Sequence, residues 1–370
     1  MKKAVIKLAA FSAATIMACA AAGCADKPKA IEMTAAEFVS SIKIGWNLGN
    51  TLESYGGETD YIRKNKENVP ESWETAWGNP LATEELVRFV KDSGFNAIRI
   101  PVSWGEHIGD APDYKVDEKW MKRVKEVVDY AVDNDLYVIL NTHHEELWAL
   151  LDEEHFEEVN AKISALWTQI AERFKNYDEH LIFEGLNEPR TLKSANEWDG
   201  GTPEEREILN SYLKTFVDSV RATGGTNSTR FLMVTPYGAN SGVDALDSLV
   251  IPNNDSHIIV SVHAYVPWRF INKGGEFTNS SKRQIDDTME ILYNKFVSKG
   301  IPVIMGEFGA KKTVEPAART EWAAYYVKSA RSKGIPCFIW DDGGDFTILD
   351  RDSLSWTNEN MISSMIQSAQ

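Results

Sequence analysis

The chain has 370 residues, of which 43% are hydrophobic and 25% charged, and its formal net charge is −16. These proportions are typical of a globular protein and exclude a chain that is disordered throughout. The excess of acidic residues argues against nucleic acid or an anionic membrane surface as a partner, because phosphate binding needs clustered Lys and Arg. Twelve Trp residues are more than a core requires, and their flat faces suit stacking against sugar rings or an extended apolar ligand.

The first 24 residues are predicted to be a processing signal. Three lysines near the start precede an apolar stretch over residues 8–22, and small residues lead up to Cys24. The run Ala21-Ala22-Gly23-Cys24 resembles a bacterial lipobox, whose cysteine is lipidated. Ala21 stands where Leu is usual, so ordinary signal-peptidase cleavage remains an alternative. We expect an exported protein, secreted or held at the cell surface by a lipid on Cys24, with a short tether over residues 25–32 and no other membrane contact.

From residue 42 onward, short β-branched runs alternate with amphipathic stretches, as in repeated βα units around a parallel sheet. The expected strands cover residues 42–46, 97–100, 137–140, 181–184, 231–234, 257–262, 303–305 and 337–340. Periodicity and capping signals predict helices over residues 84–92, 120–134, 161–174, 284–298 and 319–332, and another from residue 203. The segment between the fifth and sixth strands is too short for a convincing helix. Eight such units predict a single α/β domain over residues 33–370, a monomeric (β/α)8 TIM barrel.

Two of the expected connections are long and rich in aromatic residues. Residues 51–80 follow the first strand and hold Tyr55, Tyr61, Trp73 and Trp77, and residues 265–282 follow the sixth and hold Trp268, Phe270 and Phe277. Active sites of barrels are built from the loops that follow the strands. We therefore expect these two connections to form a substrate cleft.

Two acidic residues stand at expected strand ends. Glu188 follows the fourth strand, and Glu307 follows the seventh. Either surrounding motif, Asn-Glu-Pro or Gly-Glu-Phe-Gly, could by itself be a turn. Together, on one rim of a barrel, the two residues are what glycoside hydrolysis requires. One carboxyl group protonates the leaving oxygen, and the other attacks the sugar or stabilises the developing oxocarbenium ion.

Seven short motifs occur in order between about residues 42 and 345, one for most strand ends. They are Gly45-Trp46-Asn47-Leu48-Gly49-Asn50, Ile98-Arg99-Ile100-Pro101, Asn141-Thr142-His143-His144-Glu145, Leu186-Asn187-Glu188-Pro189, His263-Ala264-Tyr265, Gly306-Glu307-Phe308-Gly309 and Phe338-Ile339-Trp340-Asp341. Together they resemble glycoside hydrolase family 5, in particular its bacterial endo-β-1,4-glucanases. The resemblance implies a (β/α)8 fold and a retaining mechanism, with neither a metal nor an organic cofactor. It also implies that Glu188 is the general acid/base and Glu307 the nucleophile.

The resemblance also implies a role for each matched position. Arg99 lies beside Glu307 and favours its ionised form, while Glu188 needs a desolvated setting to keep its proton. Tyr265 orients the nucleophile, and His263 lies near the acid/base. The expected sugar contacts are Asn187 with the 2-hydroxyl, Trp340 as the platform under the sugar at the cleavage point, and His143 with its neighbour His144. Asn47, Trp77 and Trp148 are further candidate sugar contacts.

Alternatives remain for a metal site and for the substrate. The histidine pair at 143–144 could suggest a metal site, but adjacent histidines point in different directions and the i, i+4 spacing of a zinc helix is missing. An endo-acting β-1,4-glucanase is the leading hypothesis for the activity. A xyloglucanase, a mixed-linkage glucanase or a mannanase is the alternative within the family. A barrel that only binds polysaccharide at the cell surface would not need both acids. In every case the expected partner is a polysaccharide.

Overall fold

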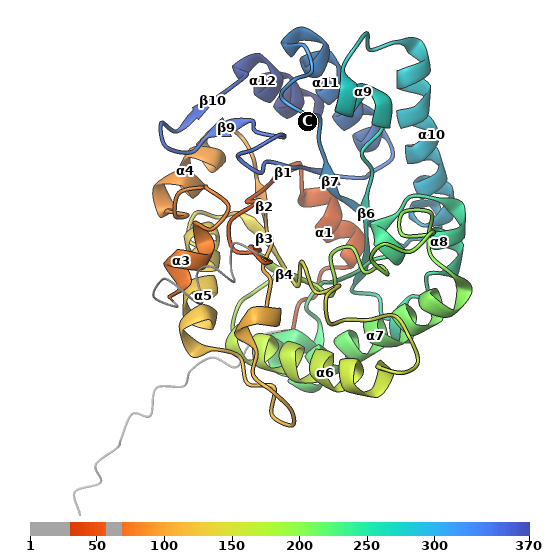
Figure 1. Ribbon diagram of the computed structural model, residues 1–370. Helices are drawn as coiled ribbons and strands as arrows, with labels where there is room; N and C mark the ends of the chain where they lie inside the picture. Colours follow the sequence, from red (N-terminus) through yellow and green to blue (C-terminus); the bar gives the residue numbers. More distant parts are fainter. Residues whose placement is uncertain (1–29, 57–68) are drawn as a thin grey trace, which may run out of the picture.

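The computed structural model describes residues 30–56 and 69–370 as a closed barrel of eight parallel strands ringed by helices (Figure 1). Each strand pairs with the next in sequence, and the eighth pairs with the first. The strands are β1 (Ile44–Asn47), β2 (Ala97–Ile100), β3 (Tyr137–Asn141), β4 (Leu181–Glu184), β5 (Leu232–Val234), β6 (Ile258–His263), β7 (Val303–Phe308) and β8 (Cys337–Ile339). The predicted (β/α)8 barrel is confirmed, and most strand ends lie within two residues of those expected.

The largest difference among the strands is at the end of β7, which continues three residues beyond the predicted end. Val262 pairs with Met305, but the next residue of β6, His263, pairs with Glu307, so Gly306 is an extra residue in β7. Such a bulge bends a strand and redirects the side chains that follow it. A side chain at position 306 would collide with His263, because a Cβ there would lie 2.9 Å from the ring atom Nε2.

Six helices of the outer layer correspond to the predicted ones. They are α4 (Glu84–Asp92), α5 (Glu118–Val132), α6 (Phe156–Arg173), α7 (Pro203–Ala222), α10 (Asn279–Lys295) and α11 (Pro316–Ser332). The start of α7 follows its sequence signal, because Thr202 and Glu205 form a reciprocal capping box with Pro203 as the first helical residue.

Further elements were not predicted. They are α1 (Ala35–Ser41), α3 (Pro70–Glu74), α8 (Val243–Ser248), α9 (Trp268–Lys273), α12 (Glu359–Ser368) and the hairpin of β9 (Leu349–Asp350) and β10 (Ser355–Trp356). The helix α8 corrects the expectation that the β5–β6 connection holds none. It has only six residues, and a short segment gives little periodic signal.

The helix α1 closes the amino-terminal end of the barrel, and in Figure 1 it is seen through the ring of strands. Phe38 of α1 is fully buried and stacks on Phe231 at 4.2 Å between ring centroids. It belongs to a separate apolar cluster with inward-facing strand residues such as Ile139 and Ile304. Ile31 is also buried there, and its backbone N–H donates to Thr229 Oγ1 at 2.7 Å. Ile31 is thus the first buried residue of the described part of the chain, and it lies inside the segment expected to be a tether.

The predicted processing signal, Cys24 and Tyr61 lie outside the described residues. Within the part of the chain that the structure describes, no helix is both long enough and apolar enough to cross a membrane.

Candidate active site

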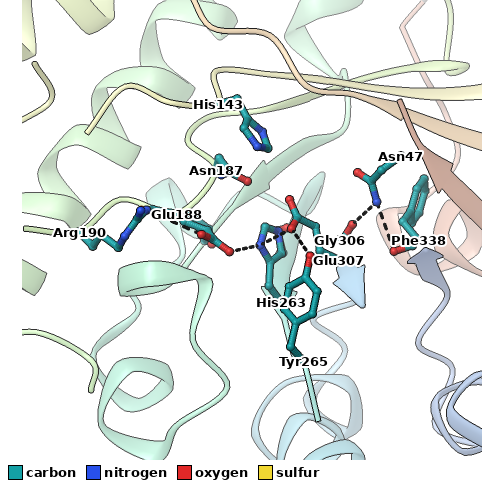
Figure 2. A network of polar contacts seen from close by, with 12 residues as sticks. Asn47, His143, Asn187, Glu188, Arg190, His263, Tyr265, Gly306, Glu307 and Phe338 are labelled. Carbon is teal, nitrogen blue, oxygen red and sulfur yellow. Dashed lines mark hydrogen bonds and ion pairs between the residues drawn. The ribbon is translucent and has the colours of Figure 1, made fainter. Parts of the chain in front are cut away.

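A cleft of about 1170 Å³ opens at the end of the barrel where the strands finish, and its lining includes both Glu188 and Glu307. Glu188 lies four residues beyond the end of β4, whereas Glu307 lies within β7. One carboxylate oxygen of Glu188, one of Glu307 and a ring nitrogen of His263 all lie within 4.8 Å of one another. The two acids predicted from the sequence are thus brought together at one point of the cleft (Figure 2).

Glu307 is held by one hydrogen bond to each carboxylate oxygen. Arg99 Nη1 donates to Oε1 at 2.7 Å, and the Tyr265 hydroxyl donates to Oε2 at 2.8 Å. Burial and the nearby Glu307 charge raise the pKa of Tyr265 well above its usual value, so this phenol remains a donor. The carboxylate therefore has a fixed orientation and a permanent positive partner.

Arg99 extends from β2 into the centre of the barrel and is fully buried. Its Nε donates to Glu184 Oε2 at 2.7 Å, Nη1 also donates to Asn47 Oδ1 at 3.0 Å, and Nη2 donates to Asn187 Oδ1 at 2.7 Å. Burial alone would lower the pKa of Arg99, but the charges of Glu184 and Glu307 reverse this and raise it. The guanidinium thus stays charged and joins β2 to residues of three other strands or their loops, β1, β4 and β7.

Glu188 is flanked by two basic groups. The His263 ring atom Nδ1 lies 2.8 Å from Oε1, and Arg190 Nη1 lies 3.7 Å from Oε2. Burial would raise the pKa of Glu188, but the hydrogen bond to His263 and the charges of His263 and Arg190 lower it below its usual value. Burial would conversely lower the pKa of His263, but Glu307 and Glu188 raise it.

The expectation that desolvation keeps the proton on Glu188 is therefore wrong for the unliganded site, because the basic neighbours outweigh burial. These opposite shifts favour an ion pair in which the His263 imidazole lies 2.8 Å from Glu188 Oε1.

The tautomer of His143 follows from the hydrogen bonds of Asn141. The backbone N–H of Val102 donates to Asn141 Oδ1 at 3.1 Å, which fixes the orientation of the amide. The Asn141 amide nitrogen therefore donates to His143 Nδ1 at 3.1 Å and to Glu184 at 3.0 Å. Burial lowers the pKa of His143 well below its usual value, so the ring is neutral and carries its proton on Nε2. His143 lines the cleft and can donate this N–H to a bound hydroxyl group.

Asn187 also lines the cleft, with its amide oxygen occupied by Arg99. Its orientation leaves the amide N–H groups for a ligand. Trp340, His144 and Trp77 line the cleft as well, the positions expected of sugar contacts. Trp340 packs closely against the loop after β1, because a Cβ on Gly49 would lie 2.8 Å from its ring. This close approach gives a physical reason for glycine in the Gly45–Asn50 motif.

Two predicted sugar contacts do not reach the cleft. Asn47 is fully buried; its amide nitrogen donates to the backbone oxygen of Gly306 at 3.0 Å and its oxygen accepts from Arg99. Trp148 lies behind the wall, where it donates to Glu145 and Lys162 Nζ lies 4.2 Å from the centre of its ring. Asn47 thus positions Arg99, and Trp148 belongs to the packing of the β3–α6 connection.

Other cleft residues were not singled out as sugar contacts from the sequence. Tyr55 lies against His144 at 4.5 Å between ring centroids, and Trp198 and Trp268 line the cleft with more than half of their surfaces exposed. These aromatic residues lie in connections that follow strands, which is the sequence feature that could have indicated sugar contacts. The sequence does not distinguish them from aromatic residues such as Trp73, which is buried.

The sequence of residues 62–345 matches the family model described as Cellulase (glycosyl hydrolase family 5). The chain is 42% identical to Endoglucanase A of Ruminococcus albus over 352 residues, covering 91% of this chain and 93% of that protein. The chain belongs to glycosyl hydrolase family 5.

Solved structures of the family agree with this fold over about nine tenths of the chain. A broad-specificity endoglucanase from Ruminococcus champanellensis with bound cellotriose has a TM-score of 0.87 and 43% identity, covering 91% of this chain and 99% of that one. A xyloglucan-specific endo-β-1,4-glucanase from a metagenomic library, in complex with cellotriose, has a TM-score of 0.84 and 41% identity, covering 90% of this chain and 98% of that one. As a member of family 5, the protein is a glycoside hydrolase.

Proposed function

We propose that the protein is an endo-acting hydrolase of β-1,4-glucan that retains the anomeric configuration, with Glu307 as nucleophile and Glu188 as general acid/base. The separation of the two carboxyl groups carries the mechanistic part of this proposal. Retaining enzymes hold these groups about 5 to 5.5 Å apart, whereas inverting enzymes leave about 6.5 to 9.5 Å for a water molecule. Here one oxygen of each carboxylate lies within 4.8 Å of the other, which favours the shorter spacing of retaining enzymes.

In the first step, a Glu307 oxygen attacks the anomeric carbon and forms a covalent glycosyl ester. The bond from this carbon to the leaving oxygen breaks, and that oxygen takes a proton from Glu188. The His263 imidazole, 2.8 Å from Glu188 Oε1, is placed to exchange a proton with this carboxyl group when substrate displaces water. The Asn187 amide can donate to the sugar 2-hydroxyl as positive charge develops on the ring.

In the second step, the Glu188 carboxylate takes a proton from water, and the resulting hydroxide oxygen attacks the anomeric carbon. The ester bond to Glu307 breaks and its carboxylate is restored, still held by Arg99 and Tyr265. Two inversions at one carbon leave the configuration unchanged.

The walls of the cleft support an extended chain of glucose units as the substrate. Trp77 and Tyr55 line one part of it, and Trp198 and Trp268 offer further exposed rings. Aromatic faces suit the apolar faces of pyranose rings. A cleft with aromatic rings at several positions suits several consecutive sugar units of a polymer. Xyloglucan is the alternative substrate favoured by a specific observation, because the xyloglucan-specific relative is 41% identical.

The decisive experiment is NMR of the first product released from a soluble β-1,4-glucan. The proposal predicts the β-anomer before mutarotation, and initial α-product would contradict the nucleophile role of Glu307. Viscosity of carboxymethyl cellulose should fall quickly with little reducing sugar released, whereas release of monosaccharide from chain ends would contradict endo action. Parallel rates on xyloglucan, mixed-linkage glucan, xylan and mannan would rank the substrates.

We further propose that the enzyme acts at the cell surface through a lipid on Cys24. The apolar leader and the small residues before Cys24 support this placement. Labelling of the full-length chain with a fatty-acid analogue should mark the wild type and not Cys24→Ser. Equal labelling of both would contradict the anchor without affecting the proposed activity.

A further inference from the structure

Arg190 lies two residues beyond Glu188 on the β4–α7 connection, and its side chain is only 11% exposed. Its Nη1 donates to the backbone oxygen of Glu188 at 2.9 Å and lies 3.7 Å from the carboxylate atom Oε2 (Figure 2). Two further carboxylates hold the guanidinium, with Nη2 3.3 Å from Glu146 Oε1 and Nε 3.2 Å from Glu197 Oε1. The charge of Arg190 is thereby fixed in place beside the acid/base.

The other side of Arg190 supports the cleft wall. The centre of its guanidinium lies 4.3 Å from the centre of the Trp198 ring, and that ring is 54% exposed and lines the cleft. The guanidinium of Arg190 therefore lies beside both the Trp198 ring and the Glu188 carboxylate. One residue supports both the sugar platform and the acid/base.

The two oxygens of Glu188 have different surroundings. Oε1 faces His263 from β6, while Oε2 faces Arg190. The other charged or titratable groups around this carboxylate are Glu307 on β7, Tyr265 after β6 and His144 after β3. Because the ring nitrogen of His263 occupies Oε1, Oε2 is the oxygen left to approach the glycosidic oxygen of the substrate. Arg190 thus places a positive charge beside the oxygen that faces the substrate.

We propose that Arg190 is a positioning residue that sets the acidity of Glu188 and so balances the two steps of the reaction. This inference rests on the proposed roles of Glu188 and Glu307. A positive charge beside Oε2 makes the protonated carboxyl group a stronger acid, which favours departure of the leaving sugar. The same charge makes the carboxylate a weaker base, which slows the attack of water in the second step.

The test is the pH dependence of kcat/KM on a soluble β-glucan for Arg190→Gln and Arg190→Lys. The alkaline limb reports loss of the proton shared by Glu188 and His263. Removing the positive charge should move this limb upward by about one pH unit. This is the low end of the shift that a nearby opposite charge causes, because Glu146 and Glu197 offset part of the charge of Arg190. Lysine keeps the charge, so Arg190→Lys should keep the limb near its wild-type position.

Arg206→Gln is the matched control for loosening of the connection. Arg206 on α7 donates to the backbone oxygens of Gly200 and Gly201, both at 2.8 Å, on the same connection. The control should leave the alkaline limb where it is. An equal shift in Arg206→Gln, an unmoved limb in Arg190→Gln or an equal shift in Arg190→Lys would each overturn the proposal.

If Arg190→Gln does not fold, Glu197→Gln decides the question. It removes a carboxylate that offsets the charge of Arg190, so the alkaline limb should move downward, and an unmoved limb would overturn the proposal. Failure of the proposed function would look different. In that case Glu188→Ala would keep near wild-type turnover, whatever the pH profiles of the Arg190 variants.

Discussion

Replacement of Arg99 by Met should destabilise the protein in a pH-dependent way. The guanidinium is fully buried and pairs with two carboxylates, Glu184 and Glu307, each at 2.7 Å. Removing one partner of a buried ion pair typically costs about 3 to 5 kcal/mol, because the other charge is left uncompensated. Because Arg99→Met leaves two buried carboxylates without this partner, we expect the free energy of unfolding to fall by about 5 kcal/mol at pH 7, near the upper end of that range. In a domain of this size that corresponds to a fall in Tm of about 10 °C.

The loss should shrink as the pH falls. A buried carboxyl group without a positive partner has its pKa raised, so the variant bears the cost fully at pH values above that raised pKa. The cost is relieved as the group becomes protonated, and it is smallest below the unfolded pKa of Glu, about 4.3. The difference in the free energy of unfolding between wild type and Arg99→Met should therefore be larger at pH 7 than at pH 4, measured by denaturant unfolding.

Arg230→Met is the control for this experiment. Arg230 is also fully buried, but its hydrogen bonds go to the side chain of Asn227 and to backbone oxygens, including that of Leu181 at 2.6 Å. Burial lowers the pKa of Arg230 to about 9, so it is charged throughout the range from pH 4 to pH 7. Its loss should destabilise equally at both pH values. Equal losses at pH 7 and pH 4 in Arg99→Met would refute the argument from uncompensated carboxylates.

Three further predictions concern the chemistry. Glu307→Ala and Glu188→Ala should each lower turnover on β-glucan by at least about 100-fold without unfolding the protein. Added azide should then yield the α-glycosyl azide with Glu307→Ala and the β-glycosyl azide with Glu188→Ala. Near wild-type turnover in either variant would contradict the role assigned to that residue. Tyr265→Phe removes a hydrogen bond to the buried Glu307 carboxylate, worth about 1.5 to 3 kcal/mol, so kcat/KM should fall about 10- to 100-fold; an unchanged kcat/KM would mean that the phenol does not assist the nucleophile. Activity should withstand prolonged treatment with EDTA, and restoration of lost activity by zinc or calcium would show that the chemistry needs a metal.

The eight strands were predictable because each is a short β-branched run buried in the barrel. The same β-branched runs also predicted that Glu188 and Glu307 lie at strand ends. The continuation of β7 was not predictable, because Gly306-Glu307-Phe308-Gly309 also reads as a turn and the bulge depends on pairing with His263. The orientation of Asn47 was not predictable either. The pattern of a strand does not show whether its last residue faces the cleft or the centre of the barrel.

The charge environment of Glu188 shows a second limit of the sequence. Desolvation could be anticipated from its place in a cleft, but the lowered pKa depends on two basic groups at opposite oxygens. One of them, Arg190, directly follows the Asn-Glu-Pro motif and could have been noticed. The other, His263, was expected nearby, but its distance from Glu188 is set by the packing of β6 against β7.

The closure of the barrel by α1 has a consequence for how the enzyme would be presented to a polymer. Ile31, the first buried residue of the described chain, lies at the end of the barrel opposite the cleft. Cys24 lies only seven residues earlier, so a lipid there would keep that end within about 25 Å of the bilayer. The cleft would then open on the side of the barrel that faces away from the membrane. If Cys24 is lipidated, a linker of this length would suffice, because the barrel itself would separate the cleft from the bilayer.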